Sequence, residues 1–336
     1  MFCFCLISYI FYYKLIVERL PIVKYNKVVP GIFIKRPNRF IAHVMINGNE
    51  EVCHVKNTGR CKELLIPGCT VYCSVSDNPQ RKTKFDLIAV EKILNFHTRV
   101  TDKNASEANS NATLAPKDKS NAKANGNACL APKDKSNAKA TNTLLVNMDS
   151  QAPNAAVKEW LASGASPFGQ IDFLKPECKH GNSRFDFYLE IKEQNTLAKQ
   201  NEIADNSSSQ RIGNDHKTID ADTNQILKSK TRKIFVEVKG VTLEQDSVVL
   251  FPDAPTERGV KHVHELIQCH GEGYETYILF VVQMDHASYF TPNRKTHPQF
   301  ADALCEAKQA GVQLLAYTCK VTPDEMVMDK PLPIKL

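Results

Sequence analysis

Hydrophobic residues between positions 30 and 96 come in short runs that alternate with polar residues. "RFIAHVMI" and "EVCHVK" flank "NGNE", and Asn-Gly between two such runs is a strong hairpin signal because both residues accept a positive φ. "PGCTVYCSVS" and "KFDLIAVEKIL" follow at regular spacing. Short and evenly spaced strands of this kind predict a small β-barrel.

From residue 143 onward, the pattern changes to helices that alternate with strands. "APNAAVKEWLASG" has helical spacing and ends in glycine, and "PTERGVKHVHELIQCHGEG" predicts a helix with Thr256 as its N-cap. "YETYILFVVQM" is a continuous apolar strand of the buried kind, and "PQFADALCEAKQAGVQLLAYTCKV" predicts a helix, a glycine and a strand. This alternation predicts an α/β sheet over 143–336 that is covered on both faces.

Three segments fall outside these two domains. Residues 1–29 open with thirteen apolar residues, which are too few for a typical membrane span and lack a preceding basic region. We interpret them as an N-terminal extension, with a weak anchor or an uncleaved signal as the alternative. Residues 101–142 contain "LAPKDKSNAKA" twice and are too polar to form a core, which predicts a disordered low-complexity insertion. Residues 192–231 are polar and irregular, and we expect them to extend a hairpin loop.

Charge is distributed unevenly along the chain. The formal net charge is +6, and residues 30–100 carry eleven basic and six acidic side chains, whereas residues 233–336 carry more acids than bases. A basic domain beside an acidic one favours a polyanionic partner such as nucleic acid, although a solvated basic face is the simpler alternative. The eleven cysteines show neither zinc-finger spacing nor a disulfide framework. Reduced thiols of this kind are typical of a cytoplasmic protein.

Two strand-like stretches carry charge inside apolar runs, "SRFDFYLE" and "FVEVKG". The side-chain period of two places Phe235, Glu237 and Lys239 on one face of a strand, with valines on the other. Asp186 lies between two phenylalanines in the same way. If the two strands pair as a hairpin with the insertion at its tip, Asp186 and Glu237 converge.

Converging carboxylates repel one another unless a cation lies between them. Mg²⁺ or Mn²⁺ prefers oxygen ligands and keeps waters for a phosphate substrate, so Asp186 and Glu237 are the candidate metal ligands. Lys239 then orients or deprotonates a water, or holds a phosphate oxygen. The pattern therefore fits metal-assisted phosphodiester hydrolysis. A cross-strand ion pair on a solvated face produces the same pattern and remains the alternative.

The sequence resembles the sugar fermentation stimulation protein A (SfsA) family. The resemblance lies in "GIFIKRPNRFIAHV", "CHVKNTGRCKELLIPGC", "SRFDFYLE", "FVEVKGVTLE" and "FPDAPTERGVKHVHEL". It implies a multi-domain α+β protein, with an N-terminal OB-like β-barrel and a C-terminal α/β domain similar to the PD-(D/E)XK restriction-endonuclease fold. It also implies non-specific DNA binding and a link to the regulation of sugar (maltose) metabolism.

The resemblance assigns roles to individual residues. The nuclease-like motif of such folds falls on Asp186, Glu237 and Lys239. Glu159, in the helix before the sheet, stands where these folds often keep an additional acid, although a solvated helix residue is the alternative.

Basic residues next to aromatic rings or at a helix N-terminus are the expected DNA contacts. These residues are Lys35, Arg36, Arg39, Arg60, Arg81, Lys82, Arg258 and Lys261. Such contacts sense charge and shape, so they predict binding without sequence specificity and with a steep salt dependence. His262 and His264 lie two apart on a helix and point away from each other, which favours structural or phosphate-facing roles over metal ligation.

Two functions remain open at this stage. One is a non-enzymatic, regulatory or architectural DNA-binding protein in the cytoplasm, with no membrane partner. The other is a Mg²⁺-dependent nuclease acting on DNA or RNA. Binding alone needs no clustered carboxylates near a phosphate, because they would repel it without a metal. A third and simpler possibility is that the affinity for DNA is incidental and the ligand is different.

Overall fold

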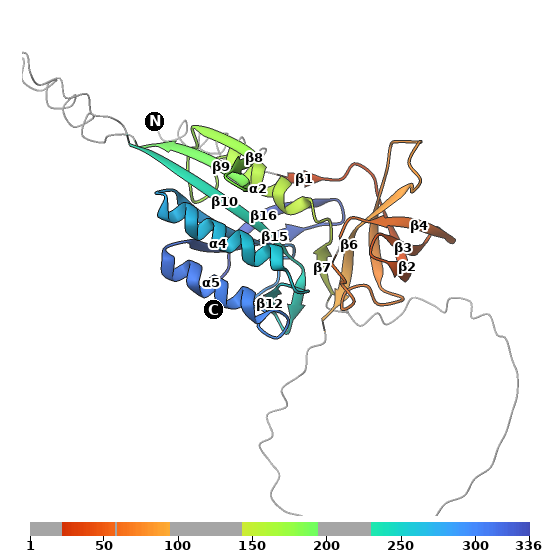
Figure 1. The fold of residues 1–336 in the computed structure, drawn as a ribbon. Helices are drawn as coiled ribbons and strands as arrows, with labels where there is room; N and C mark the ends of the chain where they lie inside the picture. The colour runs from red at the N-terminus through yellow and green to blue at the C-terminus, as the bar shows by residue number, and fades with distance from the viewer. Residues whose placement is uncertain (1–21, 58, 95–142, 194–229) are drawn as a thin grey trace, which may run out of the picture. The chain divides into compact units, whose positions relative to one another are not determined.

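The computed structural model describes residues 22–57, 59–94, 143–193 and 230–336 (Figure 1). The predictions for residues 1–21, for the insertion at 101–142 and for nearly all of the insertion at 192–231 lie outside the described residues.

The first half of the chain forms a closed five-stranded barrel, as the spacing of its strands predicts. The strands pair antiparallel except β4 and β6, whose parallel pairing closes the barrel. They are β2 (Val28–Asn38), β3 (Ile41–Ile46), β4 (Asn49–Val55), β5 (Thr70–Val75) and β6 (Phe85–Ile93). A further strand, β7 (Thr143–Asn147), lies beside β6. Apolar side chains such as Phe33, Val44 and Leu87 are buried.

The hairpin between β3 and β4 forms at the predicted Asn-Gly pair. Asn47 has φ 49° and Gly48 has φ 82°, and two consecutive positive φ angles define the tight turn whose twist matches the paired strands. Ile46 then faces Asn49 in the ladder. The register fixed by this turn keeps alternate β3 residues, including Val44, inside the barrel.

The second half of the chain, together with β1 from near the start, forms a seven-stranded mixed sheet in the order β1-β16-β15-β13-β10-β9-β8. The central strands β10, β13 and β15 are parallel, and the outer strands are antiparallel. The bounds are β1 (Ile22–Lys24), β8 (Phe173–His180), β9 (Ser183–Lys192), β10 (Thr231–Val241), β13 (Glu275–Val282), β15 (Gln313–Val321) and β16 (Glu325–Pro331). A small sheet of β11 (Leu243–Gln245), β12 (Val248–Phe251) and β14 (Tyr289–Pro292) follows β10.

The two charged stretches are neighbouring strands, as predicted. β9 and β10 pair antiparallel from Lys192–Thr231 to Phe187–Val236. The segment 193–230 therefore joins the ends of the strands that lie away from Asp186, and the hairpin has its insertion at its tip.

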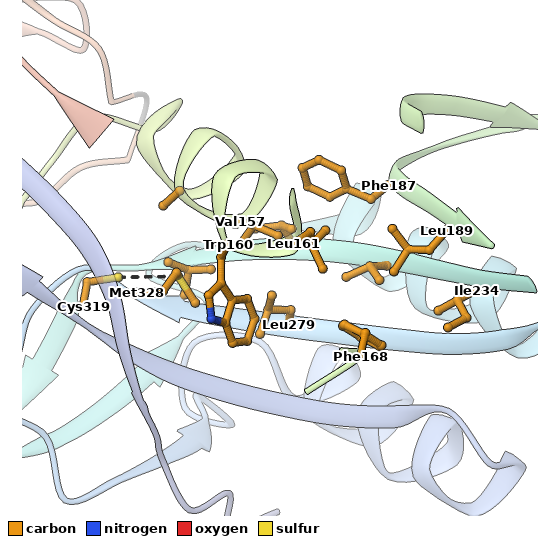
Figure 2. Packing of buried hydrophobic residues seen from close by; sticks show 14 of the residues in the cluster. Val157, Trp160, Leu161, Phe168, Phe187, Leu189, Ile234, Leu279, Cys319 and Met328 are labelled. Atoms are coloured by element: carbon orange, nitrogen blue, oxygen red, sulfur yellow. Dashed lines mark hydrogen bonds between the residues drawn. The ribbon is translucent and has the colours of Figure 1, made fainter. Parts of the chain in front are cut away.

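Helices cover both faces of this sheet. α2 (Ala152–Ala162) packs Trp160 and Leu161 on one face, against a cluster that includes Leu189 and Leu279 (Figure 2). Val236 and Val238 belong to the same cluster. α4 (Glu257–Gly271) and α5 (Pro298–Ala310) contact each other and the strands β13 and β15. His262 of α4 contacts Glu237, whose side chain alternates with the two valines, so these helices cover the opposite face.

The predicted helix ends are also present. The Thr256 hydroxyl accepts a hydrogen bond from the Gly259 amide at 3.0 Å and caps α4. Gly311 ends α5 with φ 104°, a conformation that favours glycine. Within the described part of the chain, no helix combines the length and the apolar character that a membrane crossing requires.

The boundary that we expected at residue 30 falls inside the folded structure. β1 pairs with β16, Lys24 and Glu325 form an ion pair at 2.9 Å, and β2 begins at Val28. Residues 22–24 and 28–29 therefore belong to two sheets and not to an extension. The physical reason is that "IVK" and "VV" supply the β-branched side chains that pair well in strands.

Gly240 lies at a crowded junction directly after Lys239. A Cβ at this position would be 2.7 Å from Gln283 Oε1 and 2.8 Å from Pro153 Cγ. The buried Gln283 side chain is fixed in turn, because its Nε2 donates to Asn147 and to the Asp149 carbonyl at 3.1 Å. Only glycine lets β10, β13 and the start of α2 approach this closely.

Gly240→Ala should therefore destabilise the protein by about 1–3 kcal/mol, because the added methyl group displaces fixed neighbours. Urea unfolding measures the change in free energy. The control is Gly271→Ala at the end of α4, where an added Cβ meets no atom within 4 Å. Equal effects of the two substitutions would contradict the crowding at Gly240.

Candidate functional site

Asp186 projects from β9 at the point where its pairing with β10 ends. The last paired residues are Phe187 and Val236, and beyond them the Val238 amide donates to Asp186 Oδ2 at 2.8 Å. Asn154 of α2 donates from Nδ2 to the other carboxylate oxygen, also at 2.8 Å. The carboxylate thus accepts the hydrogen bond of a β10 amide beyond the last residue pair of the two strands, and two donors hold it in place.

The environment of Asp186 disfavours its charge. Burial raises the pKa of Asp186, and the negative charge of Glu237 raises this pKa further. The hydrogen bonds from Val238 and Asn154 offset only part of this effect. The Val238 amide that binds Asp186 belongs to the residue that directly follows Glu237 in β10, so the two carboxylates come from adjacent positions of neighbouring strands.

Glu237 lies in the middle of β10 and is almost completely buried. Its Oε1 accepts hydrogen bonds from Lys239 Nζ at 2.6 Å and from His262 Nδ1 at 2.5 Å. Burial by itself raises the pKa of Glu237, but the hydrogen bond from His262 and the charge of Lys239 hold this pKa below its usual value. The Oε2 atom is buried and makes no hydrogen bond to any residue that the structure describes.

His262 connects this carboxylate to the N-terminal turns of α4. The Nε atom of Arg258 lies 3.3 Å from His262 Nε2. A guanidinium nitrogen only donates, so Nε2 must accept, and the imidazole carries its proton on Nδ1. That proton is the one donated to Glu237. Arg258, His262 and Glu237 therefore form one hydrogen-bonded chain from the surface to the buried carboxylate.

The donor set fits a hard divalent cation. Two carboxylates supply oxygen ligands, and one of them has a buried oxygen with no partner among the described residues. Such an atom costs free energy unless a partner is present. Asp186 and Glu237 would hold the ion, and Mg²⁺ and Mn²⁺ match this all-oxygen chemistry.

α2 contributes Asn154 to this site, and Glu159 lies elsewhere on the helix. Glu159 is exposed, and no hydrogen bond or ion pair joins its carboxylate to another described residue. From the sequence we missed Asn154, since an asparagine in the first turn of a helix has no pattern of its own. We assigned His262 only a structural or phosphate-facing role, and its spacing of four from Arg258 was the signal available.

A cation-lined cavity of about 700 Å³ lies between the barrel and the segment before α4. Four of the predicted DNA contacts line it, together with Lys62 and the apolar side chains of Phe33 and Leu65. The four are Lys35, Arg36, Arg39 and Arg60. Ala254 and Pro255 form the opposite side, so the "FIKRPNRF", "NTGR" and "FPDAP" stretches of the sequence meet here.

Arg36 differs from the other cations because its guanidinium is already engaged. It donates to the backbone oxygens of Asn57, Arg60 and Arg39 at 2.6–2.8 Å. Arg36 therefore shapes the loop that carries Arg60. Lys35, Arg39, Arg60 and Lys62 are exposed and supply the accessible charge.

The other predicted contacts lie outside the lining of this cavity. Arg81 binds Asp86 with two hydrogen bonds of 2.8 and 2.6 Å, which raises the pKa of Arg81, and Lys82 is exposed. Arg258 and Lys261 are exposed on α4, where Lys261 lies 3.5 Å from Glu265. Arg258 adjoins the carboxylate pair through His262.

Two family models match the chain. The model described as the SfsA N-terminal OB domain matches residues 34–95, and the model described as the sugar fermentation stimulation protein RE domain matches residues 193–325.

Individual relatives match over nearly the whole chain. A sugar fermentation stimulation protein homolog of Clostridium beijerinckii is 41% identical over 90% of this chain and 96% of its own length. That of Ruminiclostridium cellulolyticum is 40% identical over 94% of this chain and 100% of its own length. The solved structure of Pyrococcus furiosus SfsA in complex with Ca²⁺ shares the fold, with a TM-score of 0.61 and 22% identity over 94% of this chain and 98% of that one.

The two carboxylates should respond to neutralisation in opposite ways. The pKa of Asp186 is raised from its ordinary value of 3.8, so stability falls as pH rises through the interval above that value. Asp186→Asn should therefore stabilise the metal-free protein at neutral pH. The pKa of Glu237 is lowered from 4.5, so its contribution is present above that value and is lost as pH falls through the folded-state pKa.

Glu237→Gln should accordingly destabilise the protein at neutral pH by about 1–3 kcal/mol, because Lys239 loses its charged partner. Urea unfolding in the presence of a chelator, at neutral and at acidic pH, measures both effects. A shift of the same sign in both variants at neutral pH would contradict the opposed pKa values.

Proposed function

Because the chain belongs to the sugar fermentation stimulation protein (SfsA) family, we propose that it binds nucleic acid without sequence specificity and hydrolyses phosphodiester bonds. The reaction takes place at Asp186, Glu237 and Lys239 with a divalent metal ion. The observation that carries this proposal is the buried Oε2 atom of Glu237, which has no partner among the described residues, in a strand whose next residue, Val238, binds the second carboxylate, Asp186. A role in binding alone gives no reason to bury that charge.

Asp186 and Glu237 would hold the metal ion, and Asn154 and His262 fix the orientation of these two carboxylates. Mg²⁺ or Mn²⁺ supplies positive charge that offsets the repulsion between the carboxylates and a phosphate. The Pyrococcus furiosus protein was solved as a complex with Ca²⁺. Ca²⁺ takes the same class of oxygen ligands, which supports a hard-cation site in this chain as well.

Lys239 is the cation positioned to act on the substrate. Its Nζ donates to Glu237 Oε1 and is only partly exposed, so it sits at the wall of the site. From there its ammonium donates to a phosphate oxygen or orients the attacking water. His262 donates a hydrogen bond from Nδ1 to Glu237, and Arg258 at the surface binds a neighbouring phosphate group.

The barrel cavity supplies the binding surface. Lys35, Arg39, Arg60 and Lys62 contact phosphates, while the exposed ring of Phe40 next to Arg39 offers apolar surface to a base or sugar. Contacts of this type carry no sequence information, so we expect DNA of any sequence to bind, with RNA as the alternative substrate.

A regulatory DNA-binding protein without nuclease activity is the second candidate. The cation-lined cavity favours it, because binding there needs no carboxylate pair. The relatives carry sugar fermentation stimulation in their name, and under this second proposal the chain regulates sugar (maltose) metabolism. For both candidates we propose a cytoplasmic location, which is supported by the eight described cysteines, all of them free thiols.

The nuclease proposal predicts cleavage of single- or double-stranded DNA or RNA with Mg²⁺ or Mn²⁺, and none with a chelator. Glu237→Gln and Lys239→Ala should each lower the rate by about 100-fold or more, because each removes charge that stabilises the transition state. The control is Lys233→Ala, an exposed lysine on the same strand, which should keep the original rate. Binding without cleavage of any substrate would favour the second candidate, and cleavage that persists in both site variants would reveal a contaminant.

The binding proposal predicts a steep dependence of affinity on salt. The double substitution Arg39→Ala and Arg60→Ala should reduce the slope of log K against log salt by about 1.8, because each lost phosphate contact contributes about 0.9. Fluorescence anisotropy with labelled DNA at several salt concentrations measures the slope. Lys308→Ala, at an exposed lysine of α5, should leave the slope unchanged. A slope near zero for the unaltered protein would show that nucleic acid is not the ligand.

A further inference from the structure

A second cluster of potential metal ligands lies at the C-terminal end of α4, at the opposite end of the helix from Arg258. It consists of His180 at the end of β8, Cys269 in the last turn of α4 and Glu272 at the helix C-cap. One ligand atom from each lies within 4.8 Å of the others, and His180 Nε2 is 2.8 Å from Glu272 Oε2. We propose that these three side chains form a binding site for Zn²⁺ or a similar borderline-soft divalent metal.

The chemistry of the donors separates this site from the carboxylate pair. An imidazole nitrogen, a thiolate sulfur and a carboxylate oxygen are the ligands of zinc sites, whereas Mg²⁺ and Ca²⁺ prefer oxygen alone. Asp186 and Glu237 offer only oxygen. One chain therefore presents two sites with different metal preferences.

The fold holds the three ligands in position. Cys269 and Glu272 are three residues apart, so they project from the same face of α4. The negative end of the helix dipole at this terminus favours a cation. The ring of His180 packs against Phe235 and Tyr274 at centroid distances of 5.1 Å, which fixes the imidazole over the helix end.

The surrounding cavity supplies room and an additional donor. It has a volume of about 260 Å³ and is lined by all three ligands and by Glu265. The Oε2 atom of Glu265 is buried and makes no hydrogen bond to any described residue, while its Oε1 lies 3.5 Å from Lys261. Glu265 lines the cavity without belonging to the three-residue group, so a bound ion would take its fourth ligand from Glu265 or from a water molecule.

The competing explanation is an ion pair between His180 and Glu272 above a neutral cysteine. In that arrangement the thiol of Cys269, which is buried at the end of α4, keeps its proton and binds no metal. Metal binding releases that proton and forms a sulfur–metal bond, which a simple ion pair cannot produce. Spectroscopy of the sulfur–metal bond therefore distinguishes the two.

A metal ion here would also connect the two elements that build the carboxylate site. His180 precedes the turn into β9, which carries Asp186, and Cys269 shares α4 with His262. Bound metal would hold this hairpin against the helix, so binding should raise the thermal stability of the whole protein.

The test uses the full-length protein, freed of metal with a chelator and desalted, and then titrated with Co²⁺ alone or Zn²⁺ alone. We expect one Co²⁺ per chain with a thiolate-to-cobalt charge-transfer band, displacement of this band by Zn²⁺, and a rise in the unfolding temperature with Zn²⁺. Excess Mg²⁺ should not displace the cobalt.

Variants locate the site. Cys269→Ser should remove the charge-transfer band. His180→Gln and Glu272→Gln should each weaken metal binding more than about tenfold, because substituting even a residue that only supports a ligand typically costs about tenfold or more in metal affinity. Cys305→Ser, a partly exposed thiol on α5, is the matched control and should retain the band. Asp186→Asn should also retain it, which separates this site from the carboxylate pair. A missing band in the unaltered protein, or a band that persists in Cys269→Ser, would overturn the proposal.

Discussion

A buried, ionised glutamate in the central strand of the sheet is the constraint on which the arrangement of the second domain depends. Burying a lone carboxylate is very costly, so its charge must be paired. Glu237 meets this requirement with Lys239 from its own strand and His262 from α4. The helix must therefore lie over this face of the sheet with His262 directed inward, and α2 must cover the other face with an apolar stripe. The need to pair the charge of Glu237 therefore accounts both for the arrangement of the site and for the packing of α4 on the sheet.

The barrel and the sheet domain are joined by polar contacts that are equally specific. Gly59 of the barrel approaches Asp253 so closely that a Cβ would lie 2.5 Å from its carboxylate. Lys92 at the end of β6 binds the buried Glu244. The ion pair of Lys92 with the buried Glu244 fixes the end of β6 on the sheet domain. The close approach of Gly59 to Asp253 places the Gly59 backbone beside the segment that leads into α4. The cationic cavity and the Arg258 end of α4 thus belong to one continuous part of the molecule.

The pattern of the sequence predicted the parts of this structure that follow from local rules. A period of two placed Glu237 and Lys239 opposite the valines, Asn-Gly predicted the turn after β3, and Thr256 predicted the start of α4. The hairpin of β9 and β10, which brings Asp186 beside the strand of Glu237, was also predicted from the two charged stretches. The roles of the predicted site residues in catalysis and DNA binding stay predictions. Tertiary contacts account for what the sequence did not reveal. The engagement of Arg36 with three carbonyl oxygens depends on loop geometry that no spacing encodes.

The hydrogen bond of His262 to Glu237 likewise joins residues 25 positions apart through helix packing. The same limit hid the cluster of His180, Cys269 and Glu272, whose members are distributed over two elements. The position of the 193–230 segment has a consequence for the evolution of the chain. It joins β9 and β10 at the Lys192–Thr231 end. The six residue pairs of the β9–β10 ladder lie between that end and Asp186, which is the first residue of β9 beyond the ladder. Each added residue enters beyond this ladder, which acts as a spacer between the tip and the carboxylates. Changes in length and composition at the hairpin tip therefore leave the carboxylates in place. A single residue inserted between Asp186 and Phe187 would instead shift the register and turn the Asp186 carboxylate away from the site.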